Sequence, residues 1–375
     1  MNVGAGHTAA AQAIEDALHE RDPQTACHIV NCYKYAASLV SRVVSDGYIG
    51  MVKTIPQMYR FLYARAERAT QIGPFRAWVH QFTAGNLRAL MERLRPDAVV
   101  CTHAFPCGVM SEYKKQFADA PPVVGVVTDF VVHSFWIHRN IDAYAVATPE
   151  MRNSLASRGV AKDRVIVAGI PVAPAFAQAP VNREALREQL GIPADRGSVL
   201  MMSGGLGIGP LEMMIRALDE VEIPLSAIAI VGRNARLQQR VLEAAQHAHY
   251  PLRVLSFVEN VYDYMHAADV LVSKPGGLTS AEALVAGIPM VLVKPLPGQE
   301  ERNTRYLVER NVALRSKNQR ALTRTVSQLL GTPALRERMQ DAARKVAKPN
   351  AASDIAALVR DVVTTPSERK VHAIH

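Results

Sequence analysis

The segment that decides the fold is Phe257–Asn303, which reads FVENVYDYMHAADVLVSKPGGLTSAEALVAGIPMVLVKPLPGQEERN. An apolar run, Val270–Val272, leads into a glycine turn at Lys274–Gly277, and a helical pattern follows. A second apolar run, Pro289–Val293, ends in a polar loop at Pro297–Glu300. An apolar strand, a helix and another apolar strand in this order predict a unit of two parallel strands joined by a helix.

The turn after the first of these strands has the features of a diphosphate site. Gly276 and Gly277 let backbone N–H groups face outward, and the helix that we expect to begin at Thr279 adds its positive end. Carboxylate and amide side chains after the second strand suit sugar hydroxyls. The segment is therefore built like a nucleotide-sugar site. Thr279 and Glu282 also match a capping box, which would explain Glu282 without any ligand.

Strand and helix patterns alternate along the whole chain, which favours an α/β architecture with parallel sheets. In the first half, a helix is expected from the turn Gly4–His7 through Leu18. Strands are expected in that half at 28–31, 98–101, 123–128, 143–147 and 165–168. In the second half they are expected at 199–203, 226–231, 252–256, 270–273 and 290–293, before a helical run at 322–363.

The length of 375 residues suits two domains of ordinary size. The Pro- and Ala-rich segment from Gly169 to Pro180 is typical of a linker. We expect two Rossmann-like domains, at 1–170 and 182–345, joined by a linker at 171–181 and facing each other across a cleft. A helix at 346–364 is expected to pack back toward the first domain, followed by a disordered tail at 365–375.

Bulk composition narrows the class of protein. No apolar run approaches the roughly 18–20 residues of a membrane helix, and no signal-peptide pattern follows Met1. The four cysteines lack the spacing of a disulfide framework, which favours the reducing cytoplasm. Cys101, His103 and Cys107 do not match the spacing of a structural zinc site, so we expect no metal there.

Positive charge is concentrated in one window, Tyr33–Phe82, which we call the basic aromatic region. It holds seven Lys or Arg against two acidic residues, together with nine aromatic residues. Basic charge mixed with amphipathic aromatic rings favours an anionic membrane surface. Two alternatives stay open: nucleic acid, for which the chain carries no binding motif, and core-packing helices with solvated basic faces.

Three short motifs carry a resemblance to a known family: Gly4-Ala5-Gly6-His7, Thr128-Asp129-Phe130 and Pro297-Gly298-Gln299-Glu300. The chain resembles the glycosyltransferases that make monogalactosyl- and glucosyl-diacylglycerol, a group related to the lipid II-forming N-acetylglucosaminyltransferase. The resemblance covers nearly the whole chain and implies the two-domain GT-B fold. It also implies an inverting transfer of galactose or glucose from UDP-sugar to 1,2-diacylglycerol. Such an enzyme would be cytoplasmic and peripherally attached to the inner face of the cell membrane.

In this resemblance the first domain binds the lipid acceptor and supplies the base. His7 would accept the proton of the attacking hydroxyl at a helix N-terminus, where the helix dipole disfavours imidazolium. Asp129 would orient His7 or bind the glycerol hydroxyl, although it could instead cap the turn that follows it. Gly6, His133 and Trp136 would line the acceptor site, and His138 is as easily structural as functional.

The second domain would bind the donor. Its glycine loop would lie near the diphosphate, Arg233 would meet phosphate, Phe257 and Val258 would hold uracil through their backbone, and Glu282 would bind the ribose. The donor residues implied are Gly204, Gly205, Gly207, Arg233, Phe257, Val258, Gly276, Gly277, Leu278, Thr279, Glu282, Gln299, Glu300 and Asn303. No paired acids in a metal-binding spacing occur, so we expect no cofactor and backbone dipoles to neutralise the diphosphate.

Two departures from the family and several alternatives complete the expectations. Ala173 stands where relatives carry an arginine, and only Met1–Val3 precede the first glycine turn, where relatives have a strand. We therefore expect a misplaced or truncated start. A UDP-N-acetylglucosamine 2-epimerase and the lipid II-forming transferase share the fold, but the Pro-Gly-Gln-Glu and Thr-Asp-Phe motifs argue against both. An inactive UDP-sugar sensor, the choice of galactose or glucose, processivity and the oligomeric state stay open.

Overall fold

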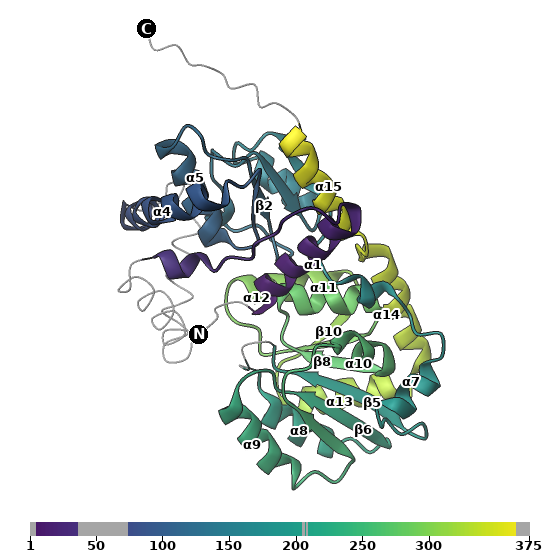
Figure 1. The fold of residues 1–375 in the computed structure, drawn as a ribbon. Helices are drawn as coiled ribbons and strands as arrows, with labels where there is room; N and C mark the ends of the chain where they lie inside the picture. Colours follow the sequence, from purple (N-terminus) through teal and green to yellow (C-terminus); the bar gives the residue numbers. More distant parts are fainter. Residues whose placement is uncertain (1–4, 37–73, 205–206, 208, 365–375) are drawn as a thin grey trace.

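The computed structural model describes residues 5–36, 74–204, 207 and 209–364, arranged as two α/β halves (Figure 1). The N-terminal half is built on a four-stranded sheet in the order β1-β2-β3-β4, with all neighbours parallel. Its strands are β1 (Val99–Cys101), β2 (Val123–Val126), β3 (Ala143–Val146) and β4 (Val165–Val167). Because parallel strands need crossovers, helices separate them along the chain.

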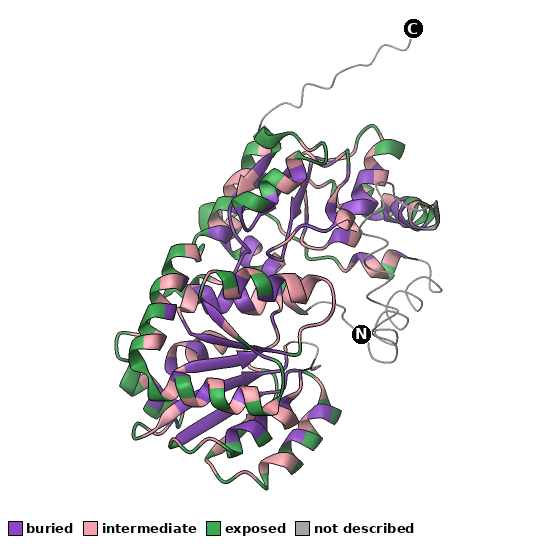
Figure 2. Cartoon of the chain, turned by 180° about the vertical axis from the view of Figure 1, so that it is seen from behind, coloured by how far each residue is buried: buried purple, intermediate pink, exposed green. Residues whose placement is uncertain are grey.

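The C-terminal half is built on a six-stranded parallel sheet in the order β10-β9-β8-β5-β6-β7. The four inner strands of this order are buried over most of their length, as Figure 2 shows, which is typical of parallel sheets covered by helices on both faces, whereas the two edge strands are more exposed. The strands are β5 (Gly197–Met202), β6 (Leu225–Ile230), β7 (Leu252–Leu255), β8 (Val270–Ser273), β9 (Met290–Val293) and β10 (Ala313–Ser316).

Helices cover both sheets. Those of the N-terminal half are α1 (Ala5–Arg21), η1 (Cys32–Tyr35), α4 (Pro74–Leu94), α5 (Ala104–Gln116), η2 (Ser134–Trp136), α6 (Pro149–Ala156), η3 (Lys162–Arg164) and η4 (Pro174–Ala177). Those that follow are α7 (Arg183–Gln189), α8 (Leu211–Asp219), α9 (Ala235–Ala245), α10 (Val261–Ala267), α11 (Gly277–Ala286), α12 (Gln299–Glu309), α13 (Gln319–Gly331), α14 (Pro333–Val346) and α15 (Ala351–Thr364).

The last helix, α15, returns to the N-terminal half and packs against α1 and β3 (Figure 1). Ala13 and Ala17 of α1 are buried together with Ala352 and Ala356 of α15. Because alanine has only one side-chain carbon, the two helix backbones approach each other closely. The chain therefore passes between the two halves twice, once before α7 and once between α14 and α15.

These two passages touch at Gly169. Its φ of +108° lies in a region that favours glycine, and a Cβ there would stand 2.4 Å from Lys348 Cβ and 3.0 Å from Ala351 Cβ. Only a glycine lets the first passage approach the second so closely. The two chain segments between the halves are therefore neighbours in space.

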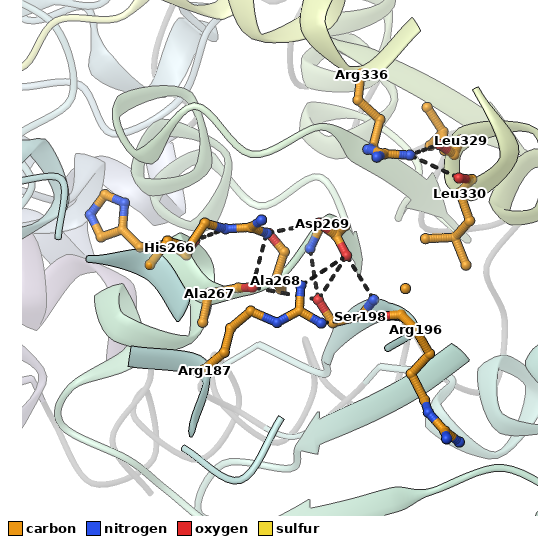
Figure 3. Close-up of polar contacts among 12 residues, drawn as sticks. Arg187, Arg196, Ser198, His266, Ala267, Ala268, Asp269, Leu329, Leu330 and Arg336 are labelled. Atoms are coloured by element: carbon orange, nitrogen blue, oxygen red, sulfur yellow. Dashed lines mark hydrogen bonds and ion pairs between the residues drawn. The ribbon is translucent and has the colours of Figure 1, made fainter. Parts of the chain in front are cut away.

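A partly buried polar network holds the amino end of the C-terminal sheet (Figure 3). Asp269, at the start of β8, accepts hydrogen bonds from Ser198 N at 2.8 Å and Arg183 Nη2 at 2.7 Å. Burial raises the pKa of Asp269, but the hydrogen bonds from Arg183 and Ser198 outweigh burial, so the pKa lies below its ordinary value. Arg187 adds bonds to the carbonyls of Pro193 and Arg196. The network joins β5, β8 and α7.

The structure confirms two α/β domains with parallel sheets, and it corrects four details. Residues 25–30 carry no regular structure, so the strand expected at 28–31 is wrong; Ile29 and Val30 are exposed and have no sheet to pack on. Helix α11 begins at Gly277, two residues before Thr279. Strand β10 was missed because its sequence, ALRS, is short and mixed, and α12 begins at Gln299 inside the expected loop.

Candidate active site

The candidate site lies where the carboxyl ends of strands from both sheets meet, with α1, α11 and α12 between the sheets (Figure 1). A Cβ on Gly277 would stand 1.9 Å from the Thr128 carbonyl oxygen, so the first turn of α11 touches the backbone that follows β2. A Cβ on Gly6 would lie 3.5 Å from Leu278 Cβ. Open α/β sheets place ligands at these strand ends.

His7 lies in the first turn of α1 and is held by the ends of β1 and β2. Its Nδ1 lies 2.9 Å from the Thr102 carbonyl oxygen and 3.0 Å from Thr128 Oγ1. Because a carbonyl oxygen can only accept, Nδ1 carries the hydrogen and Nε2 keeps its lone pair in the neutral ring. Burial lowers the pKa of His7, although the hydrogen bond to Thr102 acts in the opposite direction. His7 is therefore a neutral imidazole with Nε2 free to accept a proton.

Asp129 binds across the two halves. Its Oδ2 accepts from Gln299 Nε2 at 2.9 Å, and its Oδ1 accepts from Asn303 Nδ2 at 2.9 Å. Asn303 also accepts the Phe130 N–H at 3.1 Å and donates to the Pro275 carbonyl at 3.1 Å. The expectation that Asp129 orients His7 is wrong, because Thr102 and Thr128 hold that ring and the Asp129 carboxylate is engaged by α12.

The environment of Asp129 favours a protonated carboxyl more than water does. Burial raises its pKa to about 7; the Asn303 hydrogen bond lowers it, and the neighbouring Glu300 charge raises it. Among the described residues, the carboxyl group is held by two amides and by no cation.

Helix α12 and the residue that follows it, Arg310, make several contacts between the halves on one face. Gln299, Asn303, Tyr306 and Arg310 follow one another at intervals of four, three and four residues, the spacing of a single helix face. We call this set the α12 stripe. The Tyr306 ring stacks on Phe130 with centroids 4.7 Å apart, and Arg310 Nη2 lies 2.7 Å from Glu150 Oε1. Gln299 and Glu300, the last two residues of the Pro-Gly-Gln-Glu motif, are thus the first two residues of a helix that contacts the other half.

Glu282 is buried in α11, with 9% of its surface exposed. No hydrogen bond or ion pair reaches its carboxylate from the residues that the structure describes, and burial raises its pKa to about 7. The capping-box alternative is wrong, because the cap position is Gly276 and Thr279 is the third residue of the helix. A buried carboxyl group without a protein partner is costly unless a ligand satisfies it.

Glu300 is already bound within the C-terminal half. Its Oε2 accepts the Leu296 N–H at 2.6 Å, and its Oε1 lies 3.0 Å from Lys274 Nζ. Lys274 follows β8 and Leu296 follows β9, so Glu300 ties together the two turns that flank α11. Glu300 therefore stabilises these two turns, and its side chain is not a free loop side chain.

The remaining residues expected to bind the donor lie at the ends of β5, β6, β7 and β8. Arg233 lies over the Phe257 ring, with its guanidinium carbon 4.1 Å from the ring centroid, and Phe257 is exposed. Gly204 and Gly207 have φ of +77° and +60°, and Asn234 Nδ2 donates to the Gly207 carbonyl at 2.9 Å. Val258, Gly276, Leu278 and Thr279 are partly exposed, whereas Gly205 lies outside the described residues.

Two expected acceptor residues do not face a site. Trp136 is 2% exposed and belongs to the core, so the expectation that it lines a mouth is wrong. His133 is also buried, and its Nδ1 accepts the Phe135 N–H at 3.2 Å, which caps η2. His138 is buried beside it and lies 3.0 Å from the Phe135 carbonyl. His133, Trp136 and His138 lie in and next to η2, which packs against α5.

Sequence reasoning missed Thr102 and His103, which follow β1 and lie next to His7. The Thr102 hydroxyl donates to the His7 carbonyl at 3.0 Å, and the His103 ring lies perpendicular to the His7 ring with centroids 4.5 Å apart. Both residues directly follow a predicted buried strand, and this position indicates a ligand-facing site in an open α/β sheet. The spacing of Cys101, His103 and Cys107 suggests at most a metal site and gives no sign of this contact with His7.

Two parallel α/β domains that share a site at their strand ends define a GT-B fold, the architecture of a large class of glycosyltransferases. MurG from Acinetobacter baumannii has this fold, with a TM-score of 0.56 and 20% identity over 76% of this chain and 79% of its own. UDP-GlcNAc 2-epimerase from Neisseria meningitidis, bound to UDP-GlcNAc, gives a TM-score of 0.59 at 15% identity over 95% and 97% of the two chains.

Sequence comparison then places the chain within that class. The model of monogalactosyldiacylglycerol (MGDG) synthase matches residues 7–172, and the glycosyltransferase family 28 C-terminal domain matches residues 213–359. Processive diacylglycerol beta-glucosyltransferase of Bacillus pumilus is 30% identical over 335 residues, or 88% of this chain and 85% of the relative. The enzyme of the same name from Bacillus mycoides is 26% identical over 94% of this chain and 89% of the relative. The chain belongs to this family of diacylglycerol glycosyltransferases, which confirms the resemblance.

Proposed function

We propose that the protein is an inverting glycosyltransferase that moves galactose or glucose from UDP-sugar to the free hydroxyl of 1,2-diacylglycerol, forming a β-linked glycolipid. The relatives' names and both family models support the reaction. The observation that carries it in this chain is the His7 imidazole, whose Nδ1–H is bound by the Thr102 carbonyl at 2.9 Å. This hydrogen bond leaves Nε2 as a proton acceptor at the junction of the two halves.

The chemical step follows from that tautomer. The acceptor oxygen attacks the anomeric carbon while its proton passes to His7 Nε2. The bond from the anomeric carbon to the UDP oxygen breaks, and its electron pair leaves with UDP. A base that is neutral before the step and cationic after it gains from the departing negative charge. One displacement from the opposite face inverts the anomeric configuration, which converts an α-linked donor into a β-linked product.

The C-terminal half, proposed as residues 182–345, binds the donor. Glu282 is a buried carboxyl group that lacks a partner among the described residues, and the two ribose hydroxyls would satisfy it. Gly276 and Gly277 start α11 and offer N–H groups to the diphosphate. Arg233 stacks on Phe257 beside the β7 end, where uracil is proposed to bind to the backbone of Phe257 and Val258.

The sugar is proposed to meet the end of α12. Gln299 and Asn303 offer amide groups there, and both are now bound to Asp129. A hexose hydroxyl can exchange with one of these bonds without leaving a buried polar group unpaired. We propose that no metal or other cofactor takes part. Transfer is then expected to persist in excess chelator, because helix and backbone dipoles neutralise the diphosphate.

The N-terminal half, proposed as residues 1–170, holds the lipid and meets the membrane. Most of the basic aromatic region lies outside the described residues, but Trp78 and Phe82 on α4 are exposed and their rings stack at 5.8 Å. No described helix is long and apolar enough to cross a membrane. We propose that exposed aromatic rings and basic charge attach the enzyme peripherally to the anionic cytoplasmic face of the cell membrane.

Transfer of labelled sugar tests the proposed reaction. Purified protein is incubated with diacylglycerol in detergent and with UDP-galactose or UDP-glucose labelled in the sugar, and lipid-phase label is measured. We expect label in a monohexosyl lipid from one of the donors. UDP binding without any lipid product would support the inactive sensor instead, and conversion of UDP-N-acetylglucosamine would support the epimerase.

Vesicle binding tests the membrane proposal separately. Replacing Lys53, Arg60 and Arg65 with Glu should detach the protein from anionic vesicles, because each basic residue near the surface contributes about 1 kcal/mol. Activity on detergent-dispersed diacylglycerol should remain. Equal vesicle binding by the variant and the wild type would contradict the membrane role and favour solvated helices.

A further inference from the structure

His103 is a second histidine beside His7, and the structure determines which of its nitrogens carries the hydrogen. It is the residue before α5, and its Nδ1 accepts the Phe105 N–H at 3.0 Å. A backbone N–H can only donate, so Nδ1 of His103 carries the lone pair. In the neutral ring Nε2 therefore carries the hydrogen and is a donor. This tautomer is the opposite of the one that Thr102 imposes on His7.

The two rings share one backbone support. Thr102 accepts from His7 through its carbonyl oxygen, and that carbonyl belongs to the peptide bond that leads into His103. The ring centroids are 4.5 Å apart with the planes at 90°. Both histidines are partly exposed at the strand ends that face the C-terminal half. The pair thus offers one nitrogen that accepts a proton and one that donates a hydrogen bond.

His103 stays neutral next to a base that becomes charged. Burial, and then the neighbouring His7 and His133, lower the pKa of His103 well below its ordinary value. Tyr33 packs against the same ring at 5.9 Å and brings no charge at neutral pH. A donor that does not itself become cationic does not repel the imidazolium that forms on His7.

We propose that His103 determines acceptor specificity by donating its Nε2–H to the oxygen on C2 of the glycerol unit while His7 receives the proton of the C3 hydroxyl. This inference rests on the proposed function. In 1,2-diacylglycerol the two oxygens lie on adjacent carbons; the C3 oxygen carries a hydrogen, and the esterified C2 oxygens can only accept. One accepting and one donating imidazole match this arrangement, whereas two bases would leave the ester unbound.

The experiment compares two acceptors with the wild type and with His103→Asn. Asn is among the strongest helix caps, so it keeps the contact with Phe105 N and removes only the ring. The acceptors are 1,2-diacylglycerol and a monoacyl ester of propane-1,3-diol, which has the terminal hydroxyl but no oxygen on the middle carbon. UDP affinity and the melting temperature are measured for each protein, and His103→Ala serves as the variant that loses the cap as well.

We expect His103→Asn to lower kcat/KM for diacylglycerol by about 5- to 10-fold, the worth of one neutral hydrogen bond, and to leave the propanediol ester within about twofold. Its melting temperature and UDP affinity should equal those of the wild type, whereas His103→Ala should also melt earlier. An unchanged kcat/KM for diacylglycerol, or equal losses on both acceptors, would overturn the role in specificity. Wild-type protein that glycosylates neither acceptor would instead overturn the proposed function, and the assignment of His103 with it.

Discussion

His7 and Glu282 are two titratable groups at the centre of the proposed site, and their surroundings differ. His7 is held by two strand ends, with Thr102 and Thr128 both on its Nδ1. Glu282 has no hydrogen bond or ion pair to any residue that the structure describes. The N-terminal half therefore holds the proposed base in place before substrate binds. The C-terminal half keeps a buried carboxyl group with no partner among the described residues, and the proposed donor would supply one.

The strongest test of this contrast is to remove the preorganised base. His7→Ala should lower turnover by ~10²–10⁴-fold, the usual worth of a general base, while UDP affinity changes little. Transfer assays and calorimetric titration with UDP measure the two quantities. Turnover within about threefold of the wild type would remove His7 from the mechanism.

The contact between the halves can be broken without touching either titratable group. Gly277→Ala places a carbon 1.9 Å from the Thr128 carbonyl, so α11 and the β2 end must separate. A displacement of that size is expected to lower turnover by about 10²-fold. Gly85→Ala is the matched control, since nothing lies within 4 Å of its new carbon. Equal turnover by both variants would show that the close approach is not needed.

Glu282→Gln should weaken UDP binding by ~1–3 kcal/mol, because the ribose hydroxyls lose their charged acceptor. It should not lower stability, because the carboxylate has no protein partner to lose. Titration calorimetry beside a melting curve measures both quantities. Unchanged affinity together with a lower melting temperature would return Glu282 to a purely structural role.

The pH dependence of stability gives a smaller effect on the same residue. The pKa of Glu282 is raised to about 7, so the folded state holds its proton over a range where the unfolded state has released it. Stability is therefore greatest at acidic pH within this range and falls as pH rises toward 7. Asp129, also raised to about 7, adds in the same direction. Urea unfolding of the wild type and Glu282→Gln at pH 5.5 and 7.5 checks this prediction. The free energy of unfolding should change less between the two pH values in Glu282→Gln than in the wild type.

The smallest expected effect concerns Asp129. In Asp129→Asn, the new amide N–H group faces the amide of either Gln299 or Asn303, so one of the two hydrogen bonds to α12 is lost. Because these amides are proposed to bind the sugar, the KM for UDP-sugar should rise by about 3- to 10-fold. The pH dependence of turnover should keep its shape, since Asp129 does not touch His7 in the structure. A changed pH profile would show that the two residues are coupled after all. A steady-state series across pH measures both quantities.

The sequence predicted the sheets well because buried parallel strands are short apolar runs, as in β6 and β8. The sequence also predicted the loops proposed to bind the donor, because glycine turns and the ends of apolar strands can be recognised from residue types alone. It did not reveal what holds His7: a backbone carbonyl, that of Thr102, has no sequence signature. The partners of Asp129 come from residues about 170 positions away, which no local pattern connects.

The boundary errors have a similar origin. Thr279 and Glu282 match a capping box, yet the contact of Gly277 with Thr128 places the start of α11 earlier. Pro-Gly before Gln299 was interpreted as a loop, but Gly298 adopts φ of +98° and α12 starts directly after it. In the first case a contact between the two halves accompanies the earlier start, and in the second a glycine in the left-handed region precedes it. Sequence periodicity describes each half by itself and not their junction.

The contact at Gly169 bears on how the enzyme can open. Two segments connect the halves, and they lie against each other where Gly169 meets Lys348 and Ala351. A single connection would let one half swivel freely, whereas two adjacent ones act as a single hinge line. We expect a movement of the two halves about this line to separate the α12 stripe from Asp129, Phe130 and Glu150 together.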